Sequence, residues 1–378
     1  MRAANDAPRV LIADDQAEVV VALELLLRLR GIETEGVTSV DAVRDRLQRC
    51  TYDLVLLDLN YARDTTSGQE GLGLLSELHS RDLDLPVIVI TGWGTIDTAV
   101  EAMKRGARTF IRKPWENDDL IETVEREIAR GVASRREHER ATSDVLEGRR
   151  IQRTLLPSSL PHVSGCEMAA IWLPALAVGG DCYDTSVDSD TVTVTIGDVC
   201  GKGLPAALLM SHLQASIRAF AEAQHPSPHE LASKVNRFLC RNNTEGMFAT
   251  CFFCDIDMSR GAIRYSNAGH NWPILMRRNG TCERLSRGGV PLGLFEATSY
   301  ELGEAQFSSG DRLILFTDGV VETMSPDGIE FGDERLQTLV RVNRTSNASS
   351  ILGEIIERVR LYNHGSFGDD ATLIVCAF

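Results

Sequence analysis

Apolar, strand-like runs in the second half of the chain begin or end at aspartates. Four motifs carry them: GGDCYD with Asp181 and Asp184, TIGDVCGKG with Asp198, LFTDGVVE with Asp318, and SFGDDATLIV with Asp369 and Asp370. Carboxylates at strand ends can converge, and the neighbouring glycines let backbone and metal approach closely. Oxygen ligands of this kind suit Mg²⁺ or Mn²⁺ better than zinc. The pattern predicts a two-metal centre for phosphoester hydrolysis. The alternative is that these are ordinary turn aspartates, which would explain any single motif but is a weaker explanation for all four together.

The composition limits the class of protein. With 378 residues, 43% hydrophobic and 25% charged, we expect a globular protein of two domains. The net charge of −15 argues against sequence-independent nucleic-acid binding. No stretch approaches the roughly 20 apolar residues of a membrane span, and the N-terminal sequence lacks the apolar core of a signal peptide. The nine cysteines show no zinc spacing, so we expect a reduced, cytoplasmic protein without membrane attachment.

Residues 8–127 alternate short apolar runs with amphipathic segments. RVLIADD, DLVLLDL and LPVIVITGWG have the composition of buried parallel strands, with helical spacing between them. This order predicts a doubly wound, flavodoxin-like α/β domain whose site lies at the carboxyl ends of the strands.

Acidic residues stand at the ends of these predicted strands. Asp14 and Asp15 end the first, Asp58 ends a later one, and Thr91 and Lys113 follow two others. The carboxylates can hold a divalent cation, beside which one of them can accept a phosphoryl group. The lysine would neutralise the added charge, and the threonine would hydrogen-bond the phosphoryl oxygens.

The whole front segment resembles the receiver domain of two-component response regulators. The resemblance implies that Asp58 is the phosphoacceptor and that a sensor histidine kinase is the partner. It further implies two sets of residues: Mg²⁺ ligands Asp14, Asp15, Asp58 and the Asn60 carbonyl, and switch residues Thr91, Phe110 and Lys113. The alternative is a flavodoxin-like domain that is not phosphorylated. The segment after the acceptor departs from the receiver pattern, because Gly68 comes late and the loop is longer.

Residues 128–160 form the join between the two halves. They are rich in charge and poor in Gly and Pro up to Pro157, which favours a helix over a flexible linker. Ala141, Val145, Gln152 and Leu155 fall near heptad positions. A short coiled coil that joins two protomers and a solvated single helix both fit the pattern.

Residues 161–378 contain strand-like runs with hairpin-like connections and several helical patterns. This order predicts an α+β domain in which two mostly antiparallel sheets are sandwiched by helices.

The back-half motifs, taken in order, resemble type 2C metal-dependent serine/threonine phosphatases of the stage II sporulation and stress-response partner-switching branch. The resemblance implies two Mn²⁺ or Mg²⁺ ions, with Asp198 bridging them beside the Val199 carbonyl. Asp318 and Asp369 would complete one metal site and Asp181 the other, with Asp370 the less certain member of its pair. Two ions about 4 Å apart lower the pKa of a bridging water, which then attacks phosphorus in line.

The proton donor for the leaving group is harder to predict. Eukaryotic relatives place a histidine two residues after the bridging aspartate, where this chain has Cys200. His270 in SNAGH is one candidate, and a metal-bound water is the alternative. Lys202 could hold the phosphate or be a solvated turn residue.

Together the two halves predict a response regulator with phosphatase output. Phosphorylation of Asp58 would control dephosphorylation of phosphoserine or phosphothreonine on a protein, and the resemblance suggests an anti-sigma-factor antagonist. One alternative is a degenerate phosphatase that acts as a phospho-regulated binding module. Another is a hydrolase of small phosphoesters, although no nucleotide-binding loop is visible in the back half.

Overall fold

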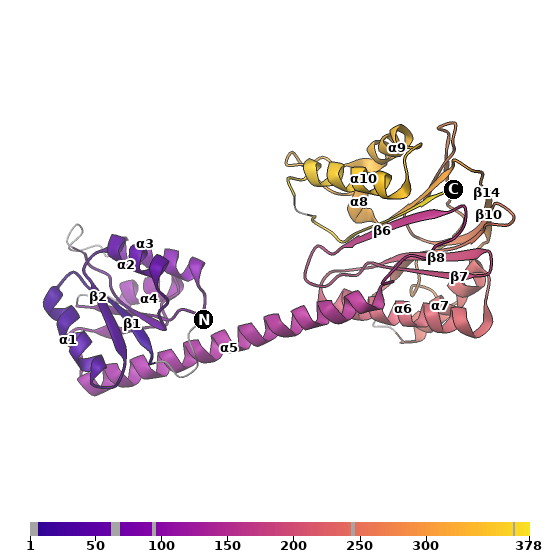
Figure 1. The fold of residues 1–378 in the computed structure, drawn as a ribbon. Coiled ribbons are helices and arrows are strands. Elements are labelled where there is room, and N and C mark those ends of the chain that lie inside the picture. The colour runs from indigo at the N-terminus through magenta and orange to yellow at the C-terminus, as the bar shows by residue number, and fades with distance from the viewer. Residues whose placement is uncertain (1–6, 62–68, 93–95, 243–245, 366) are drawn as a thin grey trace. The chain divides into compact units, whose positions relative to one another are not determined.

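The computed structural model describes residues 7–61, 69–92, 96–242, 246–365 and 367–378 (Figure 1). The chain forms two compact units, Met1–Thr142 and Ser143–Phe378. The predicted segment TTSGQEG lies partly outside the described residues, Gly68 included.

The first unit is a five-stranded parallel sheet in the order β2-β1-β3-β4-β5. Its strands are β1 (Arg9–Ala13), β2 (Glu33–Val37), β3 (Leu54–Asp58), β4 (Val87–Thr91) and β5 (Thr109–Arg112). Its helices are α1 (Ala17–Arg28), α2 (Val40–Arg49), α3 (Gln69–Arg81), α4 (Ile96–Lys104) and α5 (Asn117–Leu155). Strands β3 and β4 are buried along their whole length, as continuous apolar runs require in a sheet covered on both faces. The doubly wound prediction is confirmed.

Helix α5 is continuous through the join and contributes to both units. Near the start of α5, Leu120 and Val124 are buried in the core of the first unit. Nearer the end of the helix, the exposed side chains of Arg150 and Glu147 form an ion pair one turn apart. Residues 143–160, which the sequence placed in the join, pack with the second unit.

The second unit contains two sheets. One has the order β13-β10-β9-β8-β7, with β14 also paired to β10, and the other has the order β12-β11-β15-β16-β6. The strands are β6 (Glu167–Leu173), β7 (Cys182–Asp188), β8 (Thr191–Val199), β9 (Ala249–Asp257), β10 (Ala262–Ala268), β11 (Ile274–Met276), β12 (Cys282–Arg284), β13 (Gly288–Gly289), β14 (Gly303–Gln306), β15 (Arg312–Phe316) and β16 (Ala371–Ala377). Pairing is antiparallel except between β10 and β13.

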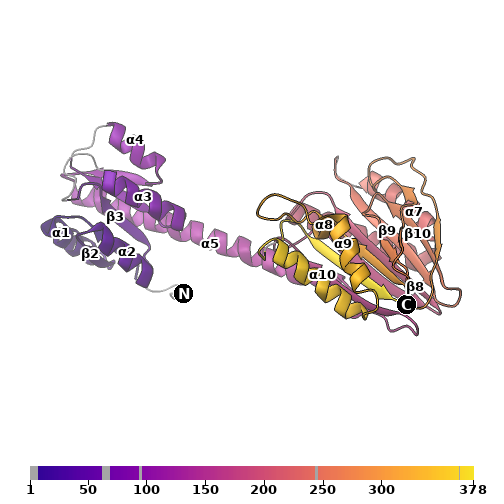
Figure 2. The same cartoon turned by 90° about the horizontal axis from the view of Figure 1, so that it is seen from above.

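Helices cover the outer faces of both sheets, which completes the predicted sandwich (Figures 1 and 2). They are α6 (Leu204–Gln224) and α7 (Pro228–Asn242) on one side, and α8 (Asp318–Val321), α9 (Gly332–Val342) and α10 (Ala348–Tyr362) on the other.

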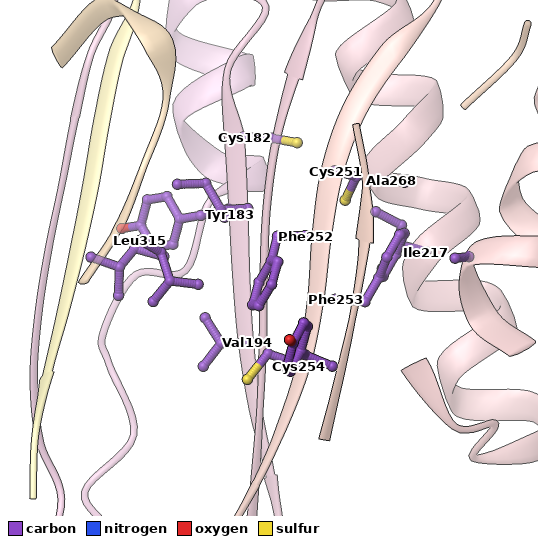
Figure 3. Close-up of a cluster of buried hydrophobic side chains, with 14 of the residues drawn as sticks. Cys182, Tyr183, Val194, Ile217, Cys251, Phe252, Phe253, Cys254, Ala268 and Leu315 are labelled. Atoms are coloured by element: carbon purple, nitrogen blue, oxygen red, sulfur yellow. The ribbon is translucent and has the colours of Figure 1, made fainter. Parts of the chain in front are cut away.

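Apolar side chains fill the space between these layers. Phe252 and Phe253 are neighbours on β9 and point to opposite faces, the first toward Leu315 of the other sheet and the second toward Ile217 of α6 (Figure 3). This alternation follows from the two-residue period of a strand. No helix of the described residues is long and apolar enough to cross a membrane.

Candidate phosphoacceptor and metal centres

The first site lies at the carboxyl edge of the parallel sheet of the first unit, where β1 and β3 end side by side. Ala13 pairs with Leu57, so Asp14 and Asp58 are brought together at this edge. One carboxylate oxygen each from Asp14, Asp15 and Asp58 lies within 4.8 Å of the others. This donor set fits a hard divalent cation such as Mg²⁺.

Lys113, the residue that follows β5, lies beside the acidic cluster. Its Nζ lies 2.5 Å from Asp14 Oδ2 and 3.2 Å from Asp58 Oδ1. Burial raises the pKa of Asp58 to about 6, while Lys113 lowers it and Asp14 raises it. Asp58 Oδ2 also accepts the Asn60 N–H at 2.9 Å. A buried carboxylate beside a cation site and a fixed ammonium group is suited to receive a phosphoryl group.

The remaining receiver residues occupy different environments. Thr91 is buried at the end of β4, in register with Arg112, the residue before Lys113. Phe110 is 48% exposed on β5. Tyr61, which the sequence did not single out, is buried three residues after Asp58, and its hydroxyl has no hydrogen-bond partner among the described residues. Its place in the lengthened loop after Asp58 was the available signal.

The second site lies at one end of the sandwich, where both sheets contribute aspartates. Asp198 is near the end of β8 in one sheet, and Asp318 opens α8 directly after β15 of the other. Burial raises the pKa of Asp198 to about 7, and the neighbouring charge of Asp318 raises it further. Burial likewise raises the pKa of Asp318 to about 6, with added effects from Glu322 and Asp369. Such mutual repulsion makes the cluster a favourable place for divalent cations.

Asp181 is fully buried in this cluster. Its Oδ2 accepts hydrogen bonds from the hydroxyls of Thr317 and Thr372, both at 2.7 Å. Its Oδ1 has no partner among the described residues. Burial, and then the charge of Asp198, raise its pKa well above the usual range. An unpartnered buried carboxylate oxygen costs free energy unless a cation satisfies it, so Asp181 fits the predicted metal site. Thr317 and Thr372 were missed, because strand-end threonines carry no specific signal.

Asp369 and Asp370 have different surroundings. Asp369 is 42% exposed at its side chain and forms an ion pair with Lys202 at 2.9 Å. Asp370 is buried, and its two oxygens accept the N–H groups of Ala175 at 2.7 Å and Gly180 at 2.6 Å. The structure therefore favours Asp369 as the ligand. Asp370 fits the role of a metal ligand less well, because its carboxylate already holds the loop before Asp181.

The predicted Val199 carbonyl lies against Gly180. A Cβ added at Gly180 would stand 2.8 Å from the Val199 oxygen, so the two loops approach too closely for any side chain at this position. Gly180 thereby brings the Asp181 segment next to the Asp198–Val199 segment.

The end of α5 is bound to the same loop. Gln152 is buried, and its amide donates to Gly179 O at 2.6 Å and accepts the Gly179 N–H at 3.1 Å. On α6, Arg218 donates to Leu155 O at 2.6 Å and forms an ion pair with Asp184 at 2.5 Å. The helical pattern placed Gln152 at a heptad position, whereas the structure gives it this loop contact.

His270 and Lys202 differ in their access to the site. His270 is buried; its Nδ1 lies 2.8 Å from the hydroxyl of Thr250, and burial lowers its pKa to about 4. A neutral, enclosed imidazole favours a structural role over proton donation. Lys202 is half exposed and also donates to Gly368 O at 2.7 Å, so its ammonium group sits at the rim of the acidic cluster.

Comparisons with known proteins match two families along the chain. The family described as "Stage II sporulation protein E (SpoIIE)" matches residues 188–378, just over half of the chain, and the "Response regulator receiver domain" matches residues 10–125. "Phosphoserine phosphatase RsbU" of Bacillus subtilis is 31% identical over 228 residues, covering 60% of this chain and 67% of RsbU.

Two solved structures share the fold of the second unit. The SiaA-PP2C domain of Pseudomonas aeruginosa has a TM-score of 0.57 at 19% identity and covers 64% of this chain and 98% of its own. The RsbU and RsbW domains of Rv1364c from Mycobacterium tuberculosis give 0.52 at 24% identity, covering 59% and 62%. The chain thus belongs to the stage II sporulation protein E family, as a protein serine/threonine phosphatase that carries a response regulator receiver domain.

Proposed function

We propose that phosphorylation of Asp58 controls the metal-dependent dephosphorylation of a phosphoserine or phosphothreonine protein by the second unit. The observation that carries this proposal is the pair of carboxylate clusters on one chain. One has an acceptor aspartate beside a lysine, and the other has a buried aspartate with an unpartnered oxygen.

In the second unit, Asp198, Asp318, Asp369 and Asp181 would hold two Mn²⁺ or Mg²⁺ ions. When bound, these ions supply an activated water and neutralise charge on the phosphoryl group. Thr317 and Thr372 keep Asp181 Oδ2 fixed, so that Oδ1 faces the site. Lys202 holds Asp369 at the rim and places a positive charge where a phosphoryl group arrives.

The substrate we propose is a phosphorylated anti-sigma-factor antagonist in the cytoplasm. Two comparisons support this class. The relative RsbU is named a phosphoserine phosphatase, and a structural neighbour carries RsbU and RsbW domains in one protein.

We further propose that the C-terminal end of α5 transmits the state of the receiver, which a sensor histidine kinase sets. Gln152 binds the backbone of Gly179, two residues before Asp181. Arg218 binds the last residue of α5 from α6, a helix that begins six residues after Asp198. A shift or rotation of this helix end would therefore move the loops of two metal ligands. Self-association through α5 stays a prediction that sedimentation before and after phosphorylation checks.

The test is phosphate release from a phosphoserine protein with Mn²⁺, with and without acetyl phosphate as the acyl-phosphate donor. We expect turnover that depends on Mn²⁺ and changes when the donor is added. Activity that survives Asp198→Asn contradicts the metal mechanism. Equal rates for the wild type and Asp58→Ala in the presence of the donor contradict the coupling. Tight binding of the phosphoprotein without turnover would favour the binding-module alternative.

A further inference from the structure

A groove of about 1040 Å³ runs along β6 within the second unit. It is lined by β6 from Ala170 to Leu173 and by the last turns of α5. Phe367 and Tyr183 also line it. The β6 side chains in the lining are only partly buried, so apolar surface is open to a partner.

Strand β6 is the last strand of its sheet. It pairs with β16 over residues 167–173, and among the described residues no second strand covers its other edge. An edge strand presents a row of unpaired N–H and C=O groups, which an extended peptide can pair with. The groove thus offers backbone hydrogen bonds as well as apolar contacts.

The charge of the groove is opposite to that of the chain. Arg149, Arg150 and Arg153 line it, and none of its lining residues is acidic, in a chain with 54 acidic and 39 basic residues. Arg150 pairs with Glu147, whereas Arg149 and Arg153 form no ion pair with any described residue. Unpaired guanidinium groups beside a free strand edge are complementary to carboxylates on an extended segment.

Two residues that line the groove contact the segments of the metal centre. Ala175 lines the groove, and its N–H donates to Asp370 Oδ1. Trp172, also in the lining, donates its indole N–H to the backbone oxygen of Asp181 at 3.0 Å. A segment bound along β6 would therefore lead toward the acidic cluster.

We propose that an extended, acidic segment of the phosphoprotein substrate adds to the free edge of β6 and contacts Arg149 and Arg153. The docked segment then presents its phosphorylated residue to the metal centre. This inference rests on the proposed phosphatase function and narrows its substrates to proteins with an acidic, strand-forming segment beside the phosphoserine.

The probe is a fluorescein-labelled phosphoserine peptide with Asp and Glu at alternate positions of a seven-residue flank, the length of β6. The same peptide with Asn and Gln tests charge, and an acidic peptide with alternate N-methylated amides tests backbone pairing. Binding is followed by fluorescence anisotropy with the full-length Asp198→Asn chain and Mn²⁺. We expect the acidic peptide to bind at least about tenfold more tightly than either of the other two.

The variant Arg149→Glu/Arg153→Glu should remove this preference. Arg237→Glu, an exposed arginine of α7 without an ion pair among the described residues, is the matched control and should keep it. Circular dichroism checks that the double variant is folded. A preference that persists in the folded double variant overturns the proposal, and so does tighter binding of a single-stranded oligonucleotide or of the N-methylated peptide.

Hydrolysis of p-nitrophenyl phosphate by the wild type separates the two proposals. If the wild type hydrolyses it with Mn²⁺ but binds all peptides alike, the docking inference fails and the phosphatase function stands. If hydrolysis is absent while binding of the acidic peptide depends on the two arginines, the phosphatase function fails and the docking surface stands.

Discussion

Replacing Gln152 by alanine tests whether the end of α5 positions the metal centre. The substitution removes two hydrogen bonds and leaves the N–H and C=O of Gly179 without their partner in a buried place. Each stranded buried group costs about 1–3 kcal/mol, so the free energy of unfolding of the second unit should fall by about 2–6 kcal/mol. Loss of such a supporting contact also weakens metal binding about 10–100-fold. We therefore expect half-saturation at an at least tenfold higher Mn²⁺ concentration.

Two measurements check this expectation. Urea titration gives the stability of the second unit, and rates of p-nitrophenyl phosphate hydrolysis across Mn²⁺ concentrations give the apparent affinity. The control is Thr154→Ala, because this exposed hydroxyl donates to Ile151 O of its own helix. A lower free energy of unfolding with an unchanged Mn²⁺ midpoint would show that Gln152 has a structural role only. An unchanged stability refutes the hydrogen-bond reasoning itself.

Three further predictions follow from the site. Asp370→Asn should lower the free energy of unfolding by about 2–4 kcal/mol, because its amide cannot accept both N–H groups. Asp369→Asn should leave the free energy of unfolding unchanged and raise the Mn²⁺ concentration needed for activity. The reverse result in the two assays would exchange the roles of the two aspartates. Thr317→Val should cost about 2.5–6 kcal/mol, because it removes the hydrogen bond to the Asp181 carboxylate and strands the buried N–H of Thr372. Urea titration against Thr338→Val, on the exposed face of α9, measures this cost. The folded-state pKa of His270, about 4, lies below its unfolded value of about 6.5, so the unfolded chain binds more protons between these pH values. The free energy of unfolding should therefore fall by up to about 3 kcal/mol as the pH drops from 6.5 to 4. His270→Gln should flatten this slope relative to the wild type, and equal slopes in both proteins would show that His270 does not titrate in this way.

The sequence by itself determined the local structure and the types of chemistry. Apolar runs closed by Asp58, Asp198 and Asp318 were enough to place carboxylates at strand ends, because strand periodicity and turn residues are local properties. The order of the runs also fixed the two fold classes, since parallel strands need helical crossovers and antiparallel strands need only hairpins.

Only the tertiary structure decided how each aspartate is used. Asp369 and Asp370 are adjacent in sequence and differ because the oxygens of Asp370 accept N–H groups from residues 195 and 190 positions earlier. The role of Gln152 likewise depends on a loop 27 residues further on. The arginines of α5 become a docking surface only because β6 ends its sheet beside them. Burial and hydrogen-bond partners are properties of the folded chain, so no periodicity in the sequence can report them.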